Sequence, residues 1–276
     1  MRIICDAPGQ TCNRLWSYVA SIAECVVEKR KMIILFFDYT IEDFPNFKHC
    51  PFIYFPLYNQ RFLEHGNRWN QFKSLTWKAT HNHRMDQIFK LLGCTKGWFT
   101  RRDMRYIQSA KKKIQFIFQP KDSILRRIGN LLKKMKAQSD IVVGVHIRRG
   151  DYASWHNGKY LFSFSQYRAF MERVIDLYPD KRVSFFVCSN EKINLFNFNN
   201  LSVFLLENTT AIEDLYMLSI CDQIMGPIST FSRWASFIGE KPLCFLERAD
   251  QQIKKSDFSV IVDFFHFKNG IEIPDI

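Results

Sequence analysis

The feature that most constrains the fold is the apolar run IVVGVHI at residues 141–147. A run without polar alternation is typical of a central parallel strand covered on both faces. Parallel strands require crossover helices, and the sequence that follows alternates helix and strand patterns. Helices are predicted at 165–178, from Thr210 (with Glu213 completing a capping box) and at about 231–238, and strands at 183–188, 203–206, 223–225 and 243–246. This half is predicted to be an α/β domain.

The first 37 residues predict a second unit of the same kind. A short strand at 3–5, a helix from about 13 to 31 and a strand at 32–37 form a βαβ pattern. Residues 38–120 are rich in aromatic and polar side chains with weak periodicity, so short helices and functional loops are expected there. Two domains follow from this reading, at 1–140 and 141–276.

The net charge of +12 is concentrated in the first domain. Residues 1–140 hold 25 basic and 11 acidic side chains, and the segment 96–136 alone holds 13 basic and two acidic ones. Such asymmetry indicates an anionic partner for this half, either nucleic acid, a membrane surface or an acidic substrate.

Composition excludes several classes of protein. The longest run drawn only from Ala, Val, Ile, Leu, Met, Phe, Trp, Tyr and Cys covers residues 32–37, whereas a membrane helix needs about 20 apolar residues. The N-terminus lacks a signal-peptide pattern, and the eight cysteines form no CxxC pair. We therefore expect a cytoplasmic protein with reduced thiols.

The motif HIRRGDY, residues 146–152, follows the predicted central strand. Ligands of open α/β sheets bind beyond the carboxyl ends of strands, and paired arginines there give planar contacts to phosphate. Gly150 permits a tight turn that returns Asp151 towards the same site. The alternative is a surface turn whose arginines pair with nearby acids.

Two further strand-to-helix turns have the chemistry of anion sites. GPISTFSRW, residues 226–234, brings two hydroxyls to a helix start, where free N–H groups and the helix dipole attract anions. GQTCNRLW, residues 9–16, is a comparable turn in the first domain. Ordinary N-capping, by Asn13 in the second case, is the alternative for both.

Together the three turns resemble the α-1,2-fucosyltransferase family. HIRRGDY matches its HxRRGDY motif, which is related to the HxRRxD form of α-1,6- and protein O-fucosyltransferases. The segment around STFSRW resembles the family's NSTFSWW, and GQTCNRLWSYVA resembles its opening GGLGNQLFQYA. The resemblance covers residues 1–37 and 141–246.

This resemblance implies a GT-B fold, with two Rossmann-like domains facing across a cleft, the first mainly binding acceptor and the second the donor. It implies transfer of fucose from GDP-fucose to a glycan hydroxyl with inversion, most directly α-1,2 to galactose. The acceptor is expected to be an oligosaccharide or a lipid-linked glycan.

The resemblance also implies residue roles. Arg148 matches the arginine that holds the diphosphate and stabilises the leaving group, with Arg149 in support. His146 matches a residue near the nucleotide, and Asp214 the acid that reads the guanine edge. The other matched donor-binding residues are Gly9, Asn13, Ser229, Thr230 and Phe231.

A metal-independent reaction is expected, with no cofactor. Leaving-group charge must be stabilised by a metal or by fixed cations and dipoles. The Asp-x-Asp pair of metal-dependent sugar transferases does not occur, and His81 and His83 are not part of a cysteine ligand pattern. Asp151 is the first candidate for the catalytic base, although it can instead orient Arg148 or Arg149. Asp38 and Asp86 are other candidates.

The chain departs from the family pattern at Cys12, at Pro227 and Ile228, at Arg233 and in VCSNE, residues 187–191. These departures leave the acceptor and the linkage open. Another GDP-sugar donor is an alternative within the same fold, and non-catalytic RNA binding is a rival that fits the basic first half.

The predicted helix at 122–137 has an apolar and a basic face. It can lie on an anionic bilayer at the inner face of the membrane, or its apolar face can pack within the protein. In the family reading, no nucleic-acid partner is expected.

Overall fold

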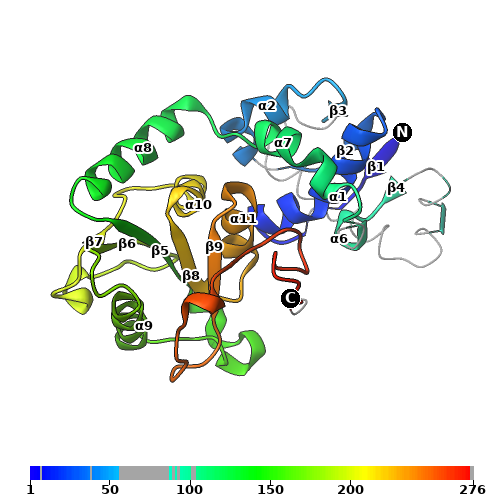
Figure 1. The fold of residues 1–276 in the computed structure, drawn as a ribbon. Helices are drawn as coiled ribbons and strands as arrows, with labels where there is room; N and C mark the ends of the chain where they lie inside the picture. The colour runs from blue at the N-terminus through cyan, green and yellow to red at the C-terminus, as the bar shows by residue number, and fades with distance from the viewer. Residues whose placement is uncertain are drawn as a thin grey trace. The chain divides into compact units, whose positions relative to one another are not determined.

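The computed structural model describes residues 1–6, 8–37, 39–55, 87–88, 91, 94–100 and 104–273. The chain divides into two compact units, Met1–Lys121 and Asp122–Ile276 (Figure 1). Each unit is built around its own sheet of mainly parallel strands. The predicted α/β class is confirmed for both units.

The sheet of the first unit has the order β3-β2-β1-β4 in the described part of the chain. Its strands are β1 (Arg2–Ile4), β2 (Met32–Ile34), β3 (Ile53–Tyr54) and β4 (Cys94–Thr95). Helix α1 (Thr11–Val27) connects β1 to β2, which pair in parallel, so the predicted βαβ unit is confirmed. The helix begins at Thr11 with Gln10 as its N-cap. The alternative that Asn13 is the cap is therefore wrong.

The other helices that the structure describes in this unit lie in the segment that sequence patterns left unassigned. They are α2 (Pro45–Lys48), α6 (Gly97–Thr100), α7 (Ile107–Ile117) and a 3₁₀ turn at Tyr39–Asp43. One face of α7 is buried, and this helix packs against α1. The buried Asp6 carboxylate, at the end of β1, accepts hydrogen bonds from the amides of Gly97 at 2.6 Å and Trp98 at 3.2 Å, which fixes the start of α6.

The second unit contains a sheet in the order β10-β9-β8-β5-β6-β7. Its strands are β5 (Ile141–Ile147), β6 (Val183–Ser189), β7 (Val203–Phe204), β8 (Gln223–Pro227), β9 (Pro242–Leu246) and β10 (Ser259–Val260). All neighbours pair in parallel except β10, which is antiparallel to β9. Strand β5 pairs with both β6 and β8, so the predicted central strand is confirmed.

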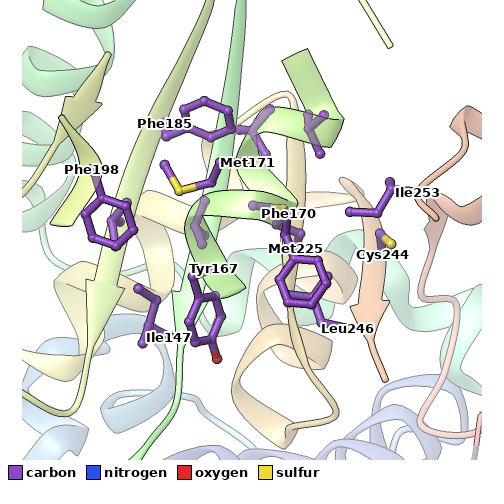
Figure 2. Close-up of a cluster of buried hydrophobic side chains, with 14 of the residues drawn as sticks. Ile147, Tyr167, Phe170, Met171, Phe185, Phe198, Met225, Cys244, Leu246 and Ile253 are labelled. Carbon is purple, nitrogen blue, oxygen red and sulfur yellow. The ribbon is translucent and has the colours of Figure 1, made fainter. Parts of the chain in front are cut away.

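Helices cover both faces of this sheet. They are α8 (Asp122–Lys136), α9 (Phe164–Asp176), α10 (Ala211–Ile220) and α11 (Thr230–Gly239), with 3₁₀ turns at Gly150–Ala153, Trp155–Gly158, Leu195–Phe198 and Lys255–Asp257. Figure 2 shows the core between α9 and one face, where Tyr167, Phe170 and Met171 meet residues such as Ile147 and Phe185. Helices α10 and α11 pack together and contact β5 and β8. Coverage on both faces explains why residues 141–147 show no polar alternation.

Helix α8 belongs to the second unit, so the boundary precedes the predicted one at residue 140. Its apolar residues Ile124, Ile128 and Met135 are buried, and the helix packs against α10 and β5. The change in net charge along the chain therefore does not coincide with the structural boundary.

All eight cysteines are buried free thiols. In the described residues, no helix is both long and apolar enough to span a bilayer.

Candidate active site

Apart from Gly9 and Asn13, the predicted donor-site residues lie where strands of the second unit end. The loops after β5 and β6 leave the carboxyl edge of the sheet, and α11 begins directly after β8 at the same edge (Figure 1). Helix α10 also starts on this side, because it follows β7 and leads back to the beginning of β8. This is the edge at which open α/β sheets bind ligands.

His146 lies at the centre of this edge and is 4% exposed. Its ring packs on the ring of Phe231, with centroids 4.8 Å apart, and its Nδ1 lies 3.5 Å from the Ser232 hydroxyl. Burial, with a smaller contribution from the charge of Arg148, lowers the pKa of His146 to about 3. The imidazole is therefore neutral at physiological pH and is suited to hydrogen bonding and packing, not to carrying a proton.

The loop after β5 and the turn after β8 are joined directly. The buried Tyr152 hydroxyl donates to the Ile228 carbonyl over 2.6 Å, and burial raises its pKa to about 12. Gly226 lies against His146, since a Cβ there would stand 2.8 Å from the His146 carbonyl oxygen. The HIRRGDY and GPISTF segments are thus in direct contact with each other.

Arg148 and Asp151 form an ion pair. Arg148 Nη2 lies 2.8 Å from Asp151 Oδ2, and Gly150 has a positive φ of 58° that turns the chain back as predicted. The Arg148 side chain is 21% exposed and that of Asp151 57%. Of the five N–H donors of the guanidinium, Asp151 takes one among the described residues. Asp151 therefore orients Arg148 in this structure, and Arg148 keeps donors for a ligand.

Arg149 has a different environment from its neighbour. Its Nε donates to Glu191 at 3.0 Å and its Nη1 to the Phe162 carbonyl at 3.0 Å, while its guanidinium lies over the Phe164 ring. Its backbone amide donates to Asn190 Oδ1. Arg149 thus anchors the loop, which leaves Arg148 as the arginine with the greater capacity for an anion.

Asn190 and Glu191 were missed as site residues by sequence reasoning. They follow β6 and hold Arg149 from the adjacent strand. Their position after a predicted strand, next to the one that carries HIRRGDY, was the available clue.

The turn after β8 shows the predicted capping arrangement. Ser229 is the N-cap of α11, and its hydroxyl accepts from the Phe231 amide at 3.1 Å. The capping alternative is therefore confirmed for Ser229. Thr230 is the first residue of the helix, and Phe231 packs on His146.

Asp214 lies in the first turn of α10, partly buried and close enough to Cys188 at the end of β6 to raise the pKa of that thiol. Burial raises the pKa of the Asp214 carboxyl to about 7. A hydrogen bond from Thr209 and the charge of Arg127 oppose this shift, and the charge of Glu213 adds to it. Its carboxylate is therefore poised to change charge near neutral pH.

Gly9 and Asn13 belong to the first unit. Gly9 has a φ of 49°, and a Cβ there would stand 2.2 Å from Asn13 Nδ2. The turn thus requires glycine beside this asparagine.

No group of three or more His, Cys, Asp or Glu side chains suited to a metal ion occurs within the described ranges. His81, His83, Asp38 and Asp86, considered above as ligands or bases, lie outside the described residues.

The sequence profile of glycosyl transferase family 11 matches residues 19–258. The chain belongs to this family. The family 11 protein is therefore a glycosyltransferase, as predicted. No curated protein matches it by sequence.

The family 11 transferase is similar in structure to solved fucosyltransferases. NodZ from Bradyrhizobium has a TM-score of 0.56 and 16% identity over 88% of this chain and 94% of NodZ. NodZ α-1,6-fucosyltransferase soaked with GDP-fucose has a TM-score of 0.57 and 16% identity over 99% of both chains. A mutant of Arabidopsis thaliana FUT1 in complex with GDP has a TM-score of 0.57 and 12% identity over 99% of this chain and 78% of FUT1. These similarities confirm the predicted GT-B fold.

Proposed function

We propose that the protein transfers fucose from GDP-fucose to a hydroxyl of a glycan, with inversion at the anomeric carbon. Membership of glycosyl transferase family 11 supports sugar transfer, and the similar structures include a fucosyltransferase soaked with GDP-fucose. The linkage proposed is α-1,2 to galactose of an oligosaccharide or lipid-linked glycan, on the strength of the HIRRGDY motif.

The observation that carries the proposal is the environment of Arg148. The guanidinium lies at a strand end, is oriented by Asp151 and retains donors for an anion. When the acceptor oxygen attacks the anomeric carbon, the bond to the β-phosphate oxygen breaks and its electrons remain on GDP. Arg148 stabilises this charge, with the N-terminus of α11 in support. We propose that these groups act without a metal.

The other donor-binding roles are proposed from the family resemblance. Asp214 accepts hydrogen bonds from the two N–H groups of guanine, and Phe231 and the neutral His146 form an apolar and hydrogen-bonding wall. Ser229, Thr230 and Arg149 support the diphosphate side. Gly9 and Asn13 bind the donor from the first unit.

The acceptor proton requires a base, and Asp151 is the first candidate. Its ion pair with Arg148 also fits a purely orienting role. Asp151→Asn separates the two roles, because the amide oxygen still accepts from Arg148 but cannot take a proton. Loss of transfer with unchanged GDP affinity supports the base. If Asp151→Asn transfers fucose at a near-normal rate and Asp151→Ala binds GDP weakly, the role of Asp151 is only to orient Arg148.

The central test compares GDP-fucose turnover in the wild type, Arg148→Ala and Arg168→Ala, with and without EDTA. Arg168 is a matched control because it forms a surface ion pair with Glu172 on α9. We expect Arg148→Ala to lower kcat by about 10²–10³-fold, with Arg168→Ala and EDTA without effect. Full activity of Arg148→Ala contradicts the proposed role, and loss of activity in EDTA contradicts metal independence.

Ligand panels distinguish the remaining alternatives. Stabilisation by GDP but not by UDP or RNA is expected in a thermal-shift assay, and turnover of GDP-mannose in place of GDP-fucose would reassign the donor. A glycan array with linkage analysis of the product tests the α-1,2 bond to galactose.

Contact with an anionic membrane remains a prediction. Because the apolar face of α8 is buried, such contact rests on its exposed basic residues, which include Arg126, Lys133 and Lys134. Co-sedimentation with phosphatidylserine vesicles that is abolished by salt would support it.

A further inference from the structure

Arg127 lies on α8, outside every motif of the donor site, yet it contacts the segment that leads into α10. Its Nη1 lies 2.8 Å from Glu213 Oε1 and 3.5 Å from the Asn208 carbonyl oxygen, and its Nη2 donates to the Glu207 carbonyl. One guanidinium therefore connects a helix to a loop that is 80 or more residues away in the sequence.

The Arg127 contacts continue into the first turn of α10. Glu213 Oε2 accepts from the Thr210 amide at 2.8 Å, and the Thr210 hydroxyl accepts from the Glu213 amide at 3.2 Å. Burial opposes ionisation of Glu213, but these bonds and Arg127 hold its pKa below the ordinary value. Arg127, Glu213 and Thr210 thus form one hydrogen-bonded unit.

Asp214 is the next residue of that turn. Thr209, which bonds to Asp214, is also within 3.5 Å of Glu213 Oε2. Arg127 forms an ion pair with Glu213, and its charge also favours ionisation of the adjacent Asp214, which the negative charge of Glu213 opposes. Without Arg127, ionised Asp214 would be less stable and the turn that carries it less constrained.

We propose that Arg127 is a positioning residue for donor recognition, which holds the first turn of α10 so that the Asp214 carboxylate has the orientation and charge needed for the guanine base. This proposal rests on the proposed function, since it assumes that Asp214 binds guanine. It also assigns a role to one residue of the basic segment.

The chain offers a matched control on the same helix. Lys136 also forms an ion pair from α8, with Asp222 before β8. Asp222 accepts from the Val142 amide at 2.7 Å at the beginning of β5, so this pair lies at the amino edge of the sheet. The Lys136–Asp222 pair connects α8 to the same unit without contacting the first turn of α10.

The test measures GDP and pyrophosphate affinity by calorimetry, and the kinetics of GDP-fucose turnover, in full-length wild type, Arg127→Gln, Arg127→Lys and Lys136→Gln. For Arg127→Gln at pH 7 we expect Kd for GDP and KM for GDP-fucose to rise by about fivefold, because raising the pKa of Asp214 by one unit from about 7 lowers its ionised fraction from one half to about one eleventh. The affinity for pyrophosphate, which has no guanine base, should stay within about twofold of the wild-type value. The same is expected of kcat at saturating GDP-fucose. Arg127→Lys should be intermediate, because a lysine supplies the charge without the planar fork.

The pH profile adds a readout that a merely structural ion pair would not move. The other titratable groups facing Asp214 are Glu213, Arg127 and the Cys188 thiol, whose pKa burial holds well above the ordinary value. The terminal phosphate and the base of GDP titrate near the ends of this range in every variant, so the difference between Arg127→Gln and the wild type reports on Asp214. In Arg127→Gln the midpoint of GDP binding should move to higher pH, so that the defect shrinks at pH 9.

The outcomes are distinguishable. If the wild type does not bind GDP, the proposed function fails. If it binds GDP and Arg127→Gln binds equally well, or if Lys136→Gln shows the same defect at equal loss of Tm, the positioning role is overturned.

Discussion

Arg148 and Arg149 are adjacent, but Arg149 makes more of its guanidinium hydrogen bonds within the protein than Arg148 does. Arg148 bonds to a side chain that is 57% exposed, whereas Arg149 bonds to Glu191 and a main-chain carbonyl and lies over Phe164. The two arginines should therefore fail in different ways when they are changed.

We predict that Arg148→Lys lowers kcat by about 10²-fold with little change in Tm, because a lysine lacks the fork that spans two oxygens. Arg149→Lys should mainly lower Tm, because it breaks contacts that hold the loop after β5. Steady-state kinetics and thermal unfolding of both variants check this. Equal kcat losses at unchanged Tm in both variants would contradict the division of roles.

The ionised form of Asp214 should destabilise the folded protein. Its pKa of about 7 exceeds the ordinary value of 3.8, so the folded state binds the proton more tightly than the unfolded state does. The cost is absent below about pH 4 and is fully present above about pH 7. Asp214→Asn should raise Tm by a few degrees at pH 8, less at pH 5.5, and weaken GDP binding.

Thermal unfolding at the two pH values, with calorimetry for GDP, measures both effects. Asp180→Asn, at an exposed aspartate, is the control and should show neither. A lower Tm of Asp214→Asn at pH 8 would show that the carboxylate stabilises the fold.

At the scale of elements, the contact between β5 and β8 determines where His146 lies. A Cβ on Gly226 would stand 2.8 Å from the His146 carbonyl oxygen and 2.9 Å from its Cβ. Gly226→Ala should destabilise the protein by about 1–3 kcal/mol and weaken GDP binding by displacing His146. Gly129→Ala is the control, since α8 leaves space there and alanine should stabilise the helix by up to about 1 kcal/mol. Denaturant unfolding provides the comparison, and an unchanged midpoint for Gly226→Ala would contradict it.

Elements with a strong pattern could be predicted from sequence, and elements defined by tertiary contacts could not. Strand β5 has a continuous apolar run, and α10 has a capping box. Helix α7 was missed. Its buried residues Ile107, Ala110, Ile114 and Ile117 have helical spacing, but the exposed Phe116 weakens the contrast between its two faces. Strand β10 has two residues, too few to show a period.

The site follows the same rule. Arg148, Asp151 and Ser229 could be proposed because motifs at strand ends mark a ligand edge. Glu191 and Arg127 act through bonds to segments 42 and 86 residues away, and a single sequence contains no record of such contacts.

At the scale of the whole molecule, the net charge of +12 conceals local pairing. In α8, Arg127 and Lys136 are bound to carboxylates of their own unit. Because their charges are paired, Arg127 and Lys136 contribute less to the attraction of an anionic partner than two unpaired basic residues would.

Hydrogen exchange should localise the donor within the chain. We predict that GDP-fucose slows exchange in peptides spanning 146–152, 188–191, 210–215 and 226–233, and in the turn at 9–13, with the strands of the first unit unchanged. The same exchange experiment on Arg148→Ala should show no protection of these peptides by GDP-fucose. GDP affinity of this variant is measured in parallel. Protection confined to the first unit would place the donor elsewhere.

The burial of all eight thiols has a practical consequence for measuring stability. A buried thiol is unreactive because the thiolate is the nucleophile, and burial raises the pKa of Cys5 to about 12 and that of Cys188 well above its ordinary value. A maleimide reagent should therefore modify the native chain only when a region opens. Since cysteines occur in both units, mass spectrometry of the alkylated peptides would time the opening of each unit separately, and GDP should delay modification of Cys188 more than that of Cys25.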